Sequence, residues 1–378
     1  MTDRKLRPAT LAAQALGWTD AATGAVIMPI HTATTFIRDP DNQYRRGRSY
    51  ARADNPTYDQ PEQLLTALEG GAGSLLFPSG MAAATAVFNS LPPGSHIVAP
   101  RVMYWALRRW LGEANLTAEF VDATSLDAIA AATQKGRTGL VWIETPANPL
   151  WSVTDIAGAA EIAHRAGARL AVDSTVATPV LTRPIELGAD LVMHSATKYL
   201  NGHSDVMAGT VTAARDDEAW RRIVGARSSG GAILGGFEAY LLLRGMRTLP
   251  LRVERACRSA EKIAAALAGN PLVAEALYPG LPNHPNHAVA ARQMQGGFGG
   301  MMSIRVKGGE KAAIATAAHV ELWKRATSLG GVESLIEHRA SVEGPGTPVP
   351  PDLLRMSVGC EDPGDLLADI EQALDQAA

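Results

Sequence analysis

The sequence has little of what secreted and membrane-spanning proteins depend on. Its two cysteines, Cys257 and Cys360, are far apart and form no CxxC pair. We therefore expect neither a disulfide framework nor a zinc site, and we expect the protein to work in a reducing cytoplasm. No apolar run approaches the roughly 18 residues that a membrane helix needs. Met1 is followed by the polar residues 2–5, which lead into no apolar stretch, so we expect no signal peptide.

An excess of charge of one sign is also lacking. The chain has 35 Lys and Arg against 38 Asp and Glu, a net charge of −3, and no long basic run. It therefore lacks the electrostatic footprint of a nucleic-acid-binding protein. The length of 378 residues, with 46% hydrophobic residues, suits one large domain plus a smaller one. We expect a globular protein that binds neither nucleic acid nor membrane.

A lysine stands where an apolar strand is predicted to end. Residues 191–194 are followed by Ser195-Ala196-Thr197-Lys198, and Gly202 lets the chain turn away. Burying an ammonium group is costly, so the pKa of such a lysine falls and it becomes a nucleophile that can form a Schiff base. The hydroxyls of Ser195 and Thr197 could hold a phosphate beside it. The structural alternative is a lysine that extends its amine into solvent.

An aspartate ends the preceding predicted strand, residues 169–173. A buried Asp173 could pair with a pyridinium nitrogen and keep the ring protonated as an electron sink. Alone, it would be interpreted as a turn or helix-capping residue. Together with Lys198 at the next strand end and the hydroxyls between them, it supplies the parts of a pyridoxal 5'-phosphate (PLP) site.

The segment that contains both residues resembles the Cys/Met-metabolism family of PLP-dependent enzymes. This family includes cystathionine γ-synthase, cystathionine γ-lyase, methionine γ-lyase and the homoserine-ester sulfhydrylases. The resemblance extends from about residue 10 to the C-terminus. It rests on Val172-Asp173-Ser174-Thr175 and on His194-Ser195-Ala196-Thr197-Lys198-Tyr199-Leu200-Asn201-Gly202-His203-Ser204-Asp205. It implies an α/β fold whose large domain is like that of the PLP-dependent aspartate aminotransferases.

Predicted strands and helices alternate between residues 60 and 243. This pattern predicts a mostly parallel sheet with helices on both faces. Ligands bind at the carboxyl ends of such strands. Gly80, Asn148, Asp173 and Lys198 each stand at or just after a predicted strand end, so we expect them to converge.

We expect three parts along the chain. The first is interrupted by prolines and cannot bury a core alone, and the last carries two predicted strands and two helices. The parts are an N-terminal arm that contacts a neighbouring subunit (1–60), a PLP-binding large α/β domain (61–245) and a C-terminal small α+β domain (246–378).

Two short motifs are candidate phosphate contacts. Gly80 and Met81 begin a predicted helix after a glycine turn, where free N–H groups and the helix dipole favour an anion. Tyr50 and Arg52 lie two apart, so in an extended segment they share a face, and arginine suits bidentate phosphate contact; a solvated loop is the alternative. The family motif Tyr-x-Arg-x-x-Asn-Pro-Thr implies that this pair reaches the phosphate of a neighbouring subunit, hence a dimer with shared sites that usually forms a tetramer.

The resemblance assigns two further residues to the cofactor. Tyr104 corresponds to a tyrosine that stacks on the pyridine ring and passes a proton to the leaving group. Asn148 corresponds to an asparagine that contacts the 3-hydroxyl of PLP and the substrate carboxylate. A core aromatic and a turn asparagine are the structural alternatives. The family usually continues with Gly-Gly-Thr or Gly-Cys-Thr after the tyrosine, and this chain has Trp105-Ala106-Leu107 instead.

Two residues of the C-terminal part are candidate substrate contacts. Arg355 stands within an apolar strand, and a buried arginine needs an anion; an exposed edge-strand arginine is the alternative. Its family counterpart binds the substrate α-carboxylate. Ser328, in the Ser-Leu-Gly-Gly motif, matches a serine that contacts the lysine and the carboxylate.

The expected chemistry is γ-elimination or γ-replacement on an L-amino acid with a heteroatom leaving group at Cγ, with Lys198, Tyr104 and Asp173 as catalytic residues. Thr327 replaces a glutamate that the family's cystathionine enzymes carry, which puts cystathionine in doubt. Glu343, unless it is a solvated loop residue, would favour a substrate with a cationic far end, such as canavanine.

Other protein classes could use the same two groups. An aminotransferase or amino-acid decarboxylase could do so, but the extended segment around Lys198 argues against both. A non-catalytic PLP-binding regulator would need a DNA-binding segment, which the first 60 residues do not resemble. We expect no metal site, and interpret residues 279–287 as a surface loop.

Overall fold

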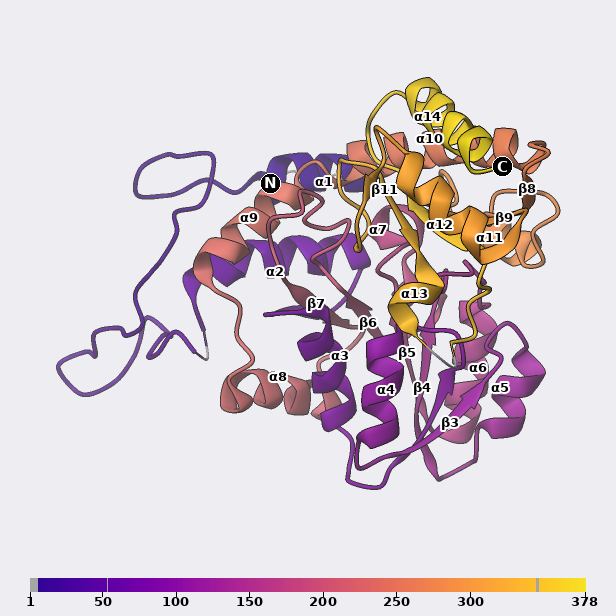
Figure 1. The fold of residues 1–378 in the computed structure, drawn as a ribbon. Helices are drawn as coiled ribbons and strands as arrows, with labels where there is room; N and C mark the ends of the chain where they lie inside the picture. Colours follow the sequence, from indigo (N-terminus) through magenta and orange to yellow (C-terminus); the bar gives the residue numbers. More distant parts are fainter. Residues whose placement is uncertain (1–5, 53, 345–346) are drawn as a thin grey trace.

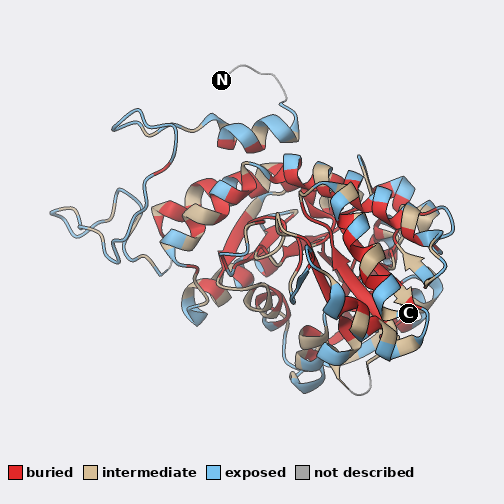
Figure 2. Ribbon diagram, turned by 45° about the horizontal axis from the view of Figure 1, so that its top comes forward, coloured by how far each residue is buried: buried red, intermediate tan, exposed pale blue. Residues whose placement is uncertain are grey.

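The N-terminal segment lies largely outside the rest of the molecule. The computed structural model describes residues 6–52, 54–344 and 347–378. Helix α1 (Pro8–Gln14) and the short helix η1 (Ala15–Gly17) pack on the body, and the chain then has little regular structure until Asn55 caps α2 (Pro56–Glu69). Figure 1 shows this indigo segment forming two loops that project away, and Figure 2 shows that most of it is exposed.

A mixed, mostly parallel seven-stranded sheet forms the larger part of the fold, as the sequence pattern predicted. The four pairings that connect β6, β5, β4, β2 and β3 are parallel, whereas β7 is antiparallel to both of its neighbours, β1 and β6. In spatial order the strands are β1 (Gly73–Phe77), β7 (Gly209–Ala213), β6 (Leu191–His194), β5 (Arg169–Asp173), β4 (Thr138–Glu144), β2 (His96–Pro100) and β3 (Thr117–Val121).

Helices cover both faces of this sheet because successive strand residues point to opposite sides. On β4, Trp142 packs into one hydrophobic core and Ile143 into another. The core around Trp142 includes α3 (Gly80–Asn89), α4 (Trp105–Glu113) and α8 (Glu218–Gly230), and the other includes α5 (Leu126–Ala132) and α6 (Ile156–Ala166). The short segments α7 (Thr178–Leu181) and η2 (Pro184–Leu187) connect β5 to β6.

The C-terminal part is built on a second, smaller sheet. Helices α9 (Gly236–Met246) and α10 (Leu249–Ala268) lead into it, and α10, α12 (Gly309–His319) and α14 (Pro363–Ala377) pack on it. In spatial order its strands are β10 (Lys324–Arg325), β11 (Leu335–His338), β12 (Leu353–Ser357), β9 (Met301–Val306) and β8 (Val273–Leu277). Helix α11 (His287–Gln293) precedes β9, and α13 (Arg339–Glu343) follows β11 and extends toward the large sheet (Figure 1).

None of the helices in the described ranges combines the length and the apolar character that crossing a membrane would require.

Candidate active site

Lys198 lies just past β6, and its amine contacts the C-terminal part of the chain. Its Nζ donates a hydrogen bond to Ser328 Oγ at 2.7 Å. Burial, and then the positive charges of Arg355 and Arg339, lower the pKa of Lys198 to about 8, although Glu337 opposes the change. At pH 7 about a tenth of this lysine is therefore a neutral amine, the nucleophilic form, far more than for an ordinary lysine.

Asp173 ends β5 as a buried carboxylate. Its Oδ1 accepts hydrogen bonds from the backbone N (3.0 Å) and Oγ1 (2.5 Å) of Thr175, and that hydroxyl accepts one from Ser195 N at 2.8 Å. One threonine thus joins the ends of β5 and β6. Burial raises the pKa of Asp173. Because a buried carboxylate is stable mainly beside a cation, this position suits a pyridinium nitrogen.

The start of α3 packs directly against Ser195. A Cβ added to Gly80 would lie 2.7 Å from both Cβ and Oγ of Ser195, so only glycine permits this approach. The Ser79 side chain caps the helix by accepting from Ala82 N at 3.0 Å. The N–H groups of Gly80 and Met81 belong to the first turn, which has no intrahelical acceptors, and so can bind a phosphate here.

The predicted contact Thr197 has a different environment. Its Oγ1 accepts from Ala208 N at 2.9 Å and lies 3.1 Å from Ala208 O, to which it donates. The hydroxyl of Thr197 therefore holds the residue before Lys198 against the loop that leads to β7.

Glu144 organises two of the predicted residues, and the sequence analysis missed it. This buried carboxylate ends β4 and accepts from Tyr104 N at 2.7 Å and from Asn148 N at 2.9 Å. It holds the start of α4, where the Tyr104 side chain is partly exposed, and the turn that carries Asn148. Burial, and then the charge of Asp173, raise the pKa of Glu144 to about 8. A glutamate at the end of the apolar run 140–143 was a signal that could have identified it.

Arg355 brings the two parts of the fold together. From β12, its Nη2 donates to Ser328 O at 2.8 Å and lies 2.7 Å from Glu337 Oε2, and its Nη1 lies 3.5 Å from Asn148 Oδ1. Ser328 adopts a φ of 87°, which is uncommon for a residue with a side chain. In this conformation its hydroxyl accepts a hydrogen bond from Lys198 and its carbonyl accepts one from Arg355.

Glu343, the predicted contact for a cationic group, already has partners. Its Oε1 accepts from Arg339 Nε at 2.9 Å and its Oε2 from Thr347 Oγ1 at 2.7 Å. Arg339 Nη1 also donates to Glu337 Oε2 at 3.0 Å. Since the charge of Glu343 is compensated by Arg339, it offers a cationic substrate little attraction. Glu337 and Arg339 were not identified from the sequence, because charged residues in and beside a short strand resemble a solvated edge.

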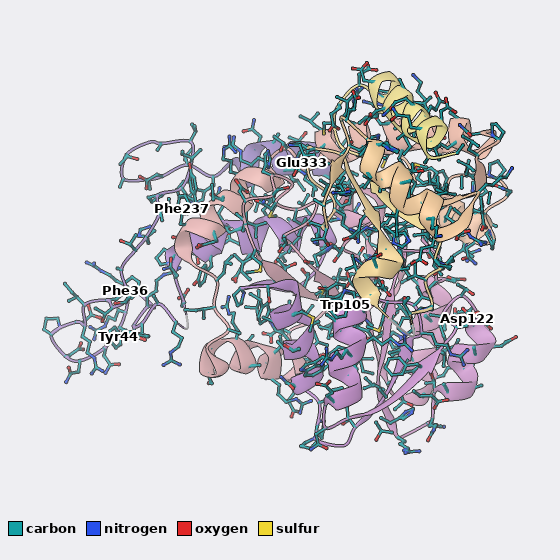
Figure 3. The ribbon with its side chains drawn as sticks, in the orientation of Figure 1. Phe36, Tyr44, Trp105, Asp122, Phe237 and Glu333 are labelled. Atoms are coloured by element: carbon teal, nitrogen blue, oxygen red, sulfur yellow. The ribbon has the colours of Figure 1, made fainter. Side chains whose placement is uncertain are left out.

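Tyr50 and Arg52 lie in the projecting segment. The Arg52 guanidinium stacks over the Tyr50 ring at 5.7 Å and its Nη1 donates to Ser228 O at 2.9 Å. Tyr50 is 48% exposed. Figure 3 shows Phe36 and Tyr44 of the same segment far from Trp105, the neighbour of Tyr104 on α4. The structure brings together Lys198, Asp173, Ser195, Gly80, Asn148, Ser328 and Arg355, but gives Tyr50 and Arg52 contacts elsewhere.

The groups present fit PLP: an amine of lowered pKa, a buried carboxylate one strand away and a helix N-terminus beside Ser195. The sequence also matches the family model described as Cys/Met metabolism PLP-dependent enzyme, over residues 9–375. The chain is 45% identical to a cystathionine γ-synthase of Mycobacterium tuberculosis, with 97% of this chain and 96% of the relative covered. It is 40% identical to a cystathionine γ-lyase of Dictyostelium discoideum, with 94% and 95% covered.

A solved structure gives the same result for the fold. The crystal structure of cystathionine γ-synthase from Xanthomonas oryzae pv. oryzae in complex with cystathionine has a TM-score of 0.93 and 38% identity, and the match covers 99% of both chains. The predicted family, cofactor and fold class are confirmed. The chain belongs to the family of Cys/Met metabolism PLP-dependent enzymes.

Proposed function

We propose that this enzyme catalyses γ-replacement, in which the thiol of L-cysteine displaces the acyloxy group from Cγ of an L-homoserine ester to give cystathionine and a free carboxylic acid. The reaction class of the family's synthases and lyases is PLP-dependent γ-elimination or γ-replacement, and the 45% identity to a cystathionine γ-synthase favours replacement. The observation that carries the proposal is the contact of Lys198 with Ser328, whose carbonyl binds Arg355. Ser328 therefore contacts both the candidate base, Lys198, and the candidate carboxylate-binding group, Arg355.

Arg355 and Asn148 bind the α-carboxylate in this proposal. Arg355 Nη1 has only a long contact with Asn148 Oδ1, at 3.5 Å, so it can turn to an incoming carboxylate. The guanidinium is buried, and charge-assisted hydrogen bonds in such a setting are strong. This pairing fixes Cα of the substrate near Lys198.

Lys198 is the base that removes the α-proton. Bound PLP supplies an electron sink that acidifies the α- and then the β-protons of the substrate. The lowered pKa of Lys198 makes its neutral form available, and the hydroxyl of Ser328 holds Nζ in place. Asp173 would hold the ring nitrogen, and Gly80, Met81 and Ser195 would hold the phosphate. Thr197, whose hydroxyl is bonded to Ala208, would support this turn from beside the phosphate. Tyr104 would deliver a proton to the leaving oxygen.

A substrate panel tests this function. The wild-type enzyme should form cystathionine from an O-acyl-L-homoserine and L-cysteine faster than it releases ammonia and 2-oxo acid from cystathionine, methionine or canavanine. Inertness of every homoserine ester would refute the proposal. The relatives support neither the canavanine alternative nor the non-catalytic regulator. Turnover of canavanine alone would favour the first, and turnover of no compound in the panel would favour the second.

The pH dependence of PLP uptake tests the state of Lys198. Only the neutral amine attacks an aldehyde, so the uptake rate of the apoprotein should rise with pH and level off above a midpoint of about 8. Arg355→Gln removes a positive charge that lowers this pKa, so its midpoint should move upward. The uptake is followed by the absorbance of bound cofactor. Arg305→Gln, a partly exposed arginine paired with Asp352, is the control and should keep the wild-type midpoint. A downward shift in Arg355→Gln would contradict the argument.

We also propose that a second copy of the chain completes each site with its Tyr50 and Arg52. The projecting segment exposes apolar side chains that a partner could cover, among them Val26 at 73% and Ile37 at 91%. Within this proposal the chain divides into the arm (1–60), the large domain (61–245) and the small domain (246–378). Assembly into a tetramer and a cytoplasmic location belong to it as well, the latter supported by the free thiols of Cys257 and Cys360.

Complementation between inactive variants tests the shared site. Arg52→Ala and Lys198→Ala should each be inactive or nearly so, since one lacks the phosphate contact and the other the base. Reassociated subunits should regain about a quarter of wild-type activity, because half of the dimers are mixed and each has one intact site. The mixture is assayed after co-refolding, with each variant refolded alone as control. A mixture that is no more active than the two variants refolded alone would contradict a shared site.

A further inference from the structure

The guanidinium of Arg339 keeps one donor without a partner. Arg339 begins α13, is 2% exposed, and uses Nε for Glu343 and Nη1 for Glu337. Its Nη2 is fully buried and has no hydrogen-bond partner among the described residues. Native proteins rarely leave a buried charged donor unsatisfied, so this nitrogen requires an explanation.

Electrostatics place this group at the active site. The charge of Arg339 contributes to the lowered pKa of Lys198 and acts in the same direction on Glu144, the residue that holds the backbone of Tyr104. These effects agree with the printed contacts, which lead from Arg339 through Glu337 and Arg355 to Ser328, the partner of Lys198. In the view of Figure 1, α13 lies between the small sheet and α4. Figure 3, drawn from the same side, labels Trp105 on α4.

Glu337 sets Arg339 beside the guanidinium that binds the α-carboxylate in our proposal. One oxygen, Glu337 Oε2, receives Arg339 Nη1 at 3.0 Å and Arg355 Nη2 at 2.7 Å. The two cations are thus held as neighbours by a shared anion, and Arg339 is oriented further by Glu343. A substrate carboxylate at Arg355 is therefore separated from this second guanidinium by a single shared carboxylate, that of Glu337.

The hydrogen-bonding character of the free nitrogen, and not the net charge of the cluster, favours a carboxylate there. Glu337 and Glu343 are balanced by Arg339 and Arg355, so the cluster is neutral before a substrate binds. The free group is a donor, which requires an acceptor, and a carboxylate gives it the strongest hydrogen bond. This is the opposite of the cationic far end that Glu343 alone predicted.

We propose that Arg339 is a specificity-determining residue whose Nη2 binds a carboxylate carried beyond Cγ. The inference rests on the proposed γ-replacement, because it requires a substrate that extends past Cγ. The carboxylate can belong to the acyl group of the homoserine ester or to the incoming thiol amino acid. Both sources present the same chemistry to Arg339, and a kinetic comparison separates them.

Arg339→Gln, which removes the charge and keeps a polar side chain, is the test variant. Two matched pairs are compared by kcat/KM: O-succinyl- against O-acetyl-L-homoserine, and L-cysteine against cysteamine. The variant should lose roughly ten- to a hundredfold more activity on the carboxylate-bearing member of at least one pair. The pair that shows the selective loss identifies the source. Equal losses on all four compounds, or no loss, would overturn the proposal.

Binding of unreactive probes gives a second readout. L-2-aminoadipate carries a carboxylate beyond Cγ, and L-norleucine has the same chain length without it. Calorimetry on the holoenzyme should show that wild type prefers aminoadipate by about tenfold or more, and that Arg339→Gln abolishes the preference. Equal affinity of the wild type for both probes would overturn the proposal even if the enzyme were active.

Two further variants keep the result interpretable. Arg109→Gln removes an arginine on α4 whose side chain is 74% exposed, and it should keep the wild-type ratios. If Arg339→Gln folds poorly, the double variant with Glu343→Gln leaves no uncompensated carboxylate and replaces it in both assays. A wild type that converts no homoserine ester would refute the proposed function, while the probe experiment would still decide the role of Arg339.

Discussion

Replacement of Lys198 by alanine should abolish turnover. In the proposed mechanism, the variant loses both the amine that bonds to the cofactor and the base that removes the α-proton. A positioned base alone contributes roughly 10²–10⁴-fold. We therefore expect kcat to fall at least about 10³-fold. The absorbance of bound cofactor should lose the band that reports the covalent link, and mass spectrometry after borohydride reduction should find no cofactor on the chain.

The control for this prediction is Lys262→Ala on α10. Lys262 is exposed on the helix that packs on the small sheet, so activity and absorbance should remain those of the wild type. Partial recovery of the Lys198→Ala enzyme by added methylamine would support the role of the amine as base. Undiminished activity of Lys198→Ala would remove the basis of the proposed mechanism.

Replacement of Asp173 by asparagine should have the second largest effect. The buried carboxylate would be replaced by a neutral amide of the same shape, so the ring nitrogen would lose the charge that keeps it protonated. Removing one partner of a buried charge pair costs about 3–5 kcal/mol, which corresponds to roughly 10²–10⁴ in rate when the loss appears in the transition state. We expect kcat to fall within this range while KM changes little.

The Asp173→Asn variant should still bind cofactor, because Lys198 and the phosphate contacts remain. Thermal unfolding should show little loss of stability, since Thr175 N can still donate to the amide oxygen. Asp365→Asn, on the exposed first turn of α14, serves as the matched control. A fall in affinity for PLP with an unchanged kcat would mean that Asp173 anchors the cofactor without influencing its chemistry.

The parts of the site that follow strand ends could be predicted from the sequence. Lys198 and Asp173 each follow an apolar run, and the parallel pairing of β5 with β6 puts both at the same edge of the sheet. Gly80 was predictable for the same reason, because it begins a helix directly after β1. The alternation of strands and helices similarly gave the larger sheet and its two covered faces.

The residues that depend on distant partners could not be predicted. Glu337 and Arg339 belong to β11 and α13, where buried charges compensate each other, so no hydrophobic period marks them as interior. Glu144 is oriented by two backbone N–H groups that come together only in the folded chain. The edge strand β3 was not predicted from the sequence. Polar residues at its exposed alternate positions interrupt the apolar run that would mark a buried strand.

The sharing of Glu337 Oε2 by Arg339 and Arg355 has a consequence for how the enzyme can change. Under the proposed roles, altering position 339 to admit another substrate also disturbs the anion that orients Arg355. Substrate selectivity and binding of the α-carboxylate are then linked through one atom, Glu337 Oε2. Changes in binding free energy caused by substitutions at 339 and 355 are then expected to be non-additive. New preferences in this lineage would therefore arise through paired replacements, with position 337 adjusting as position 339 varies.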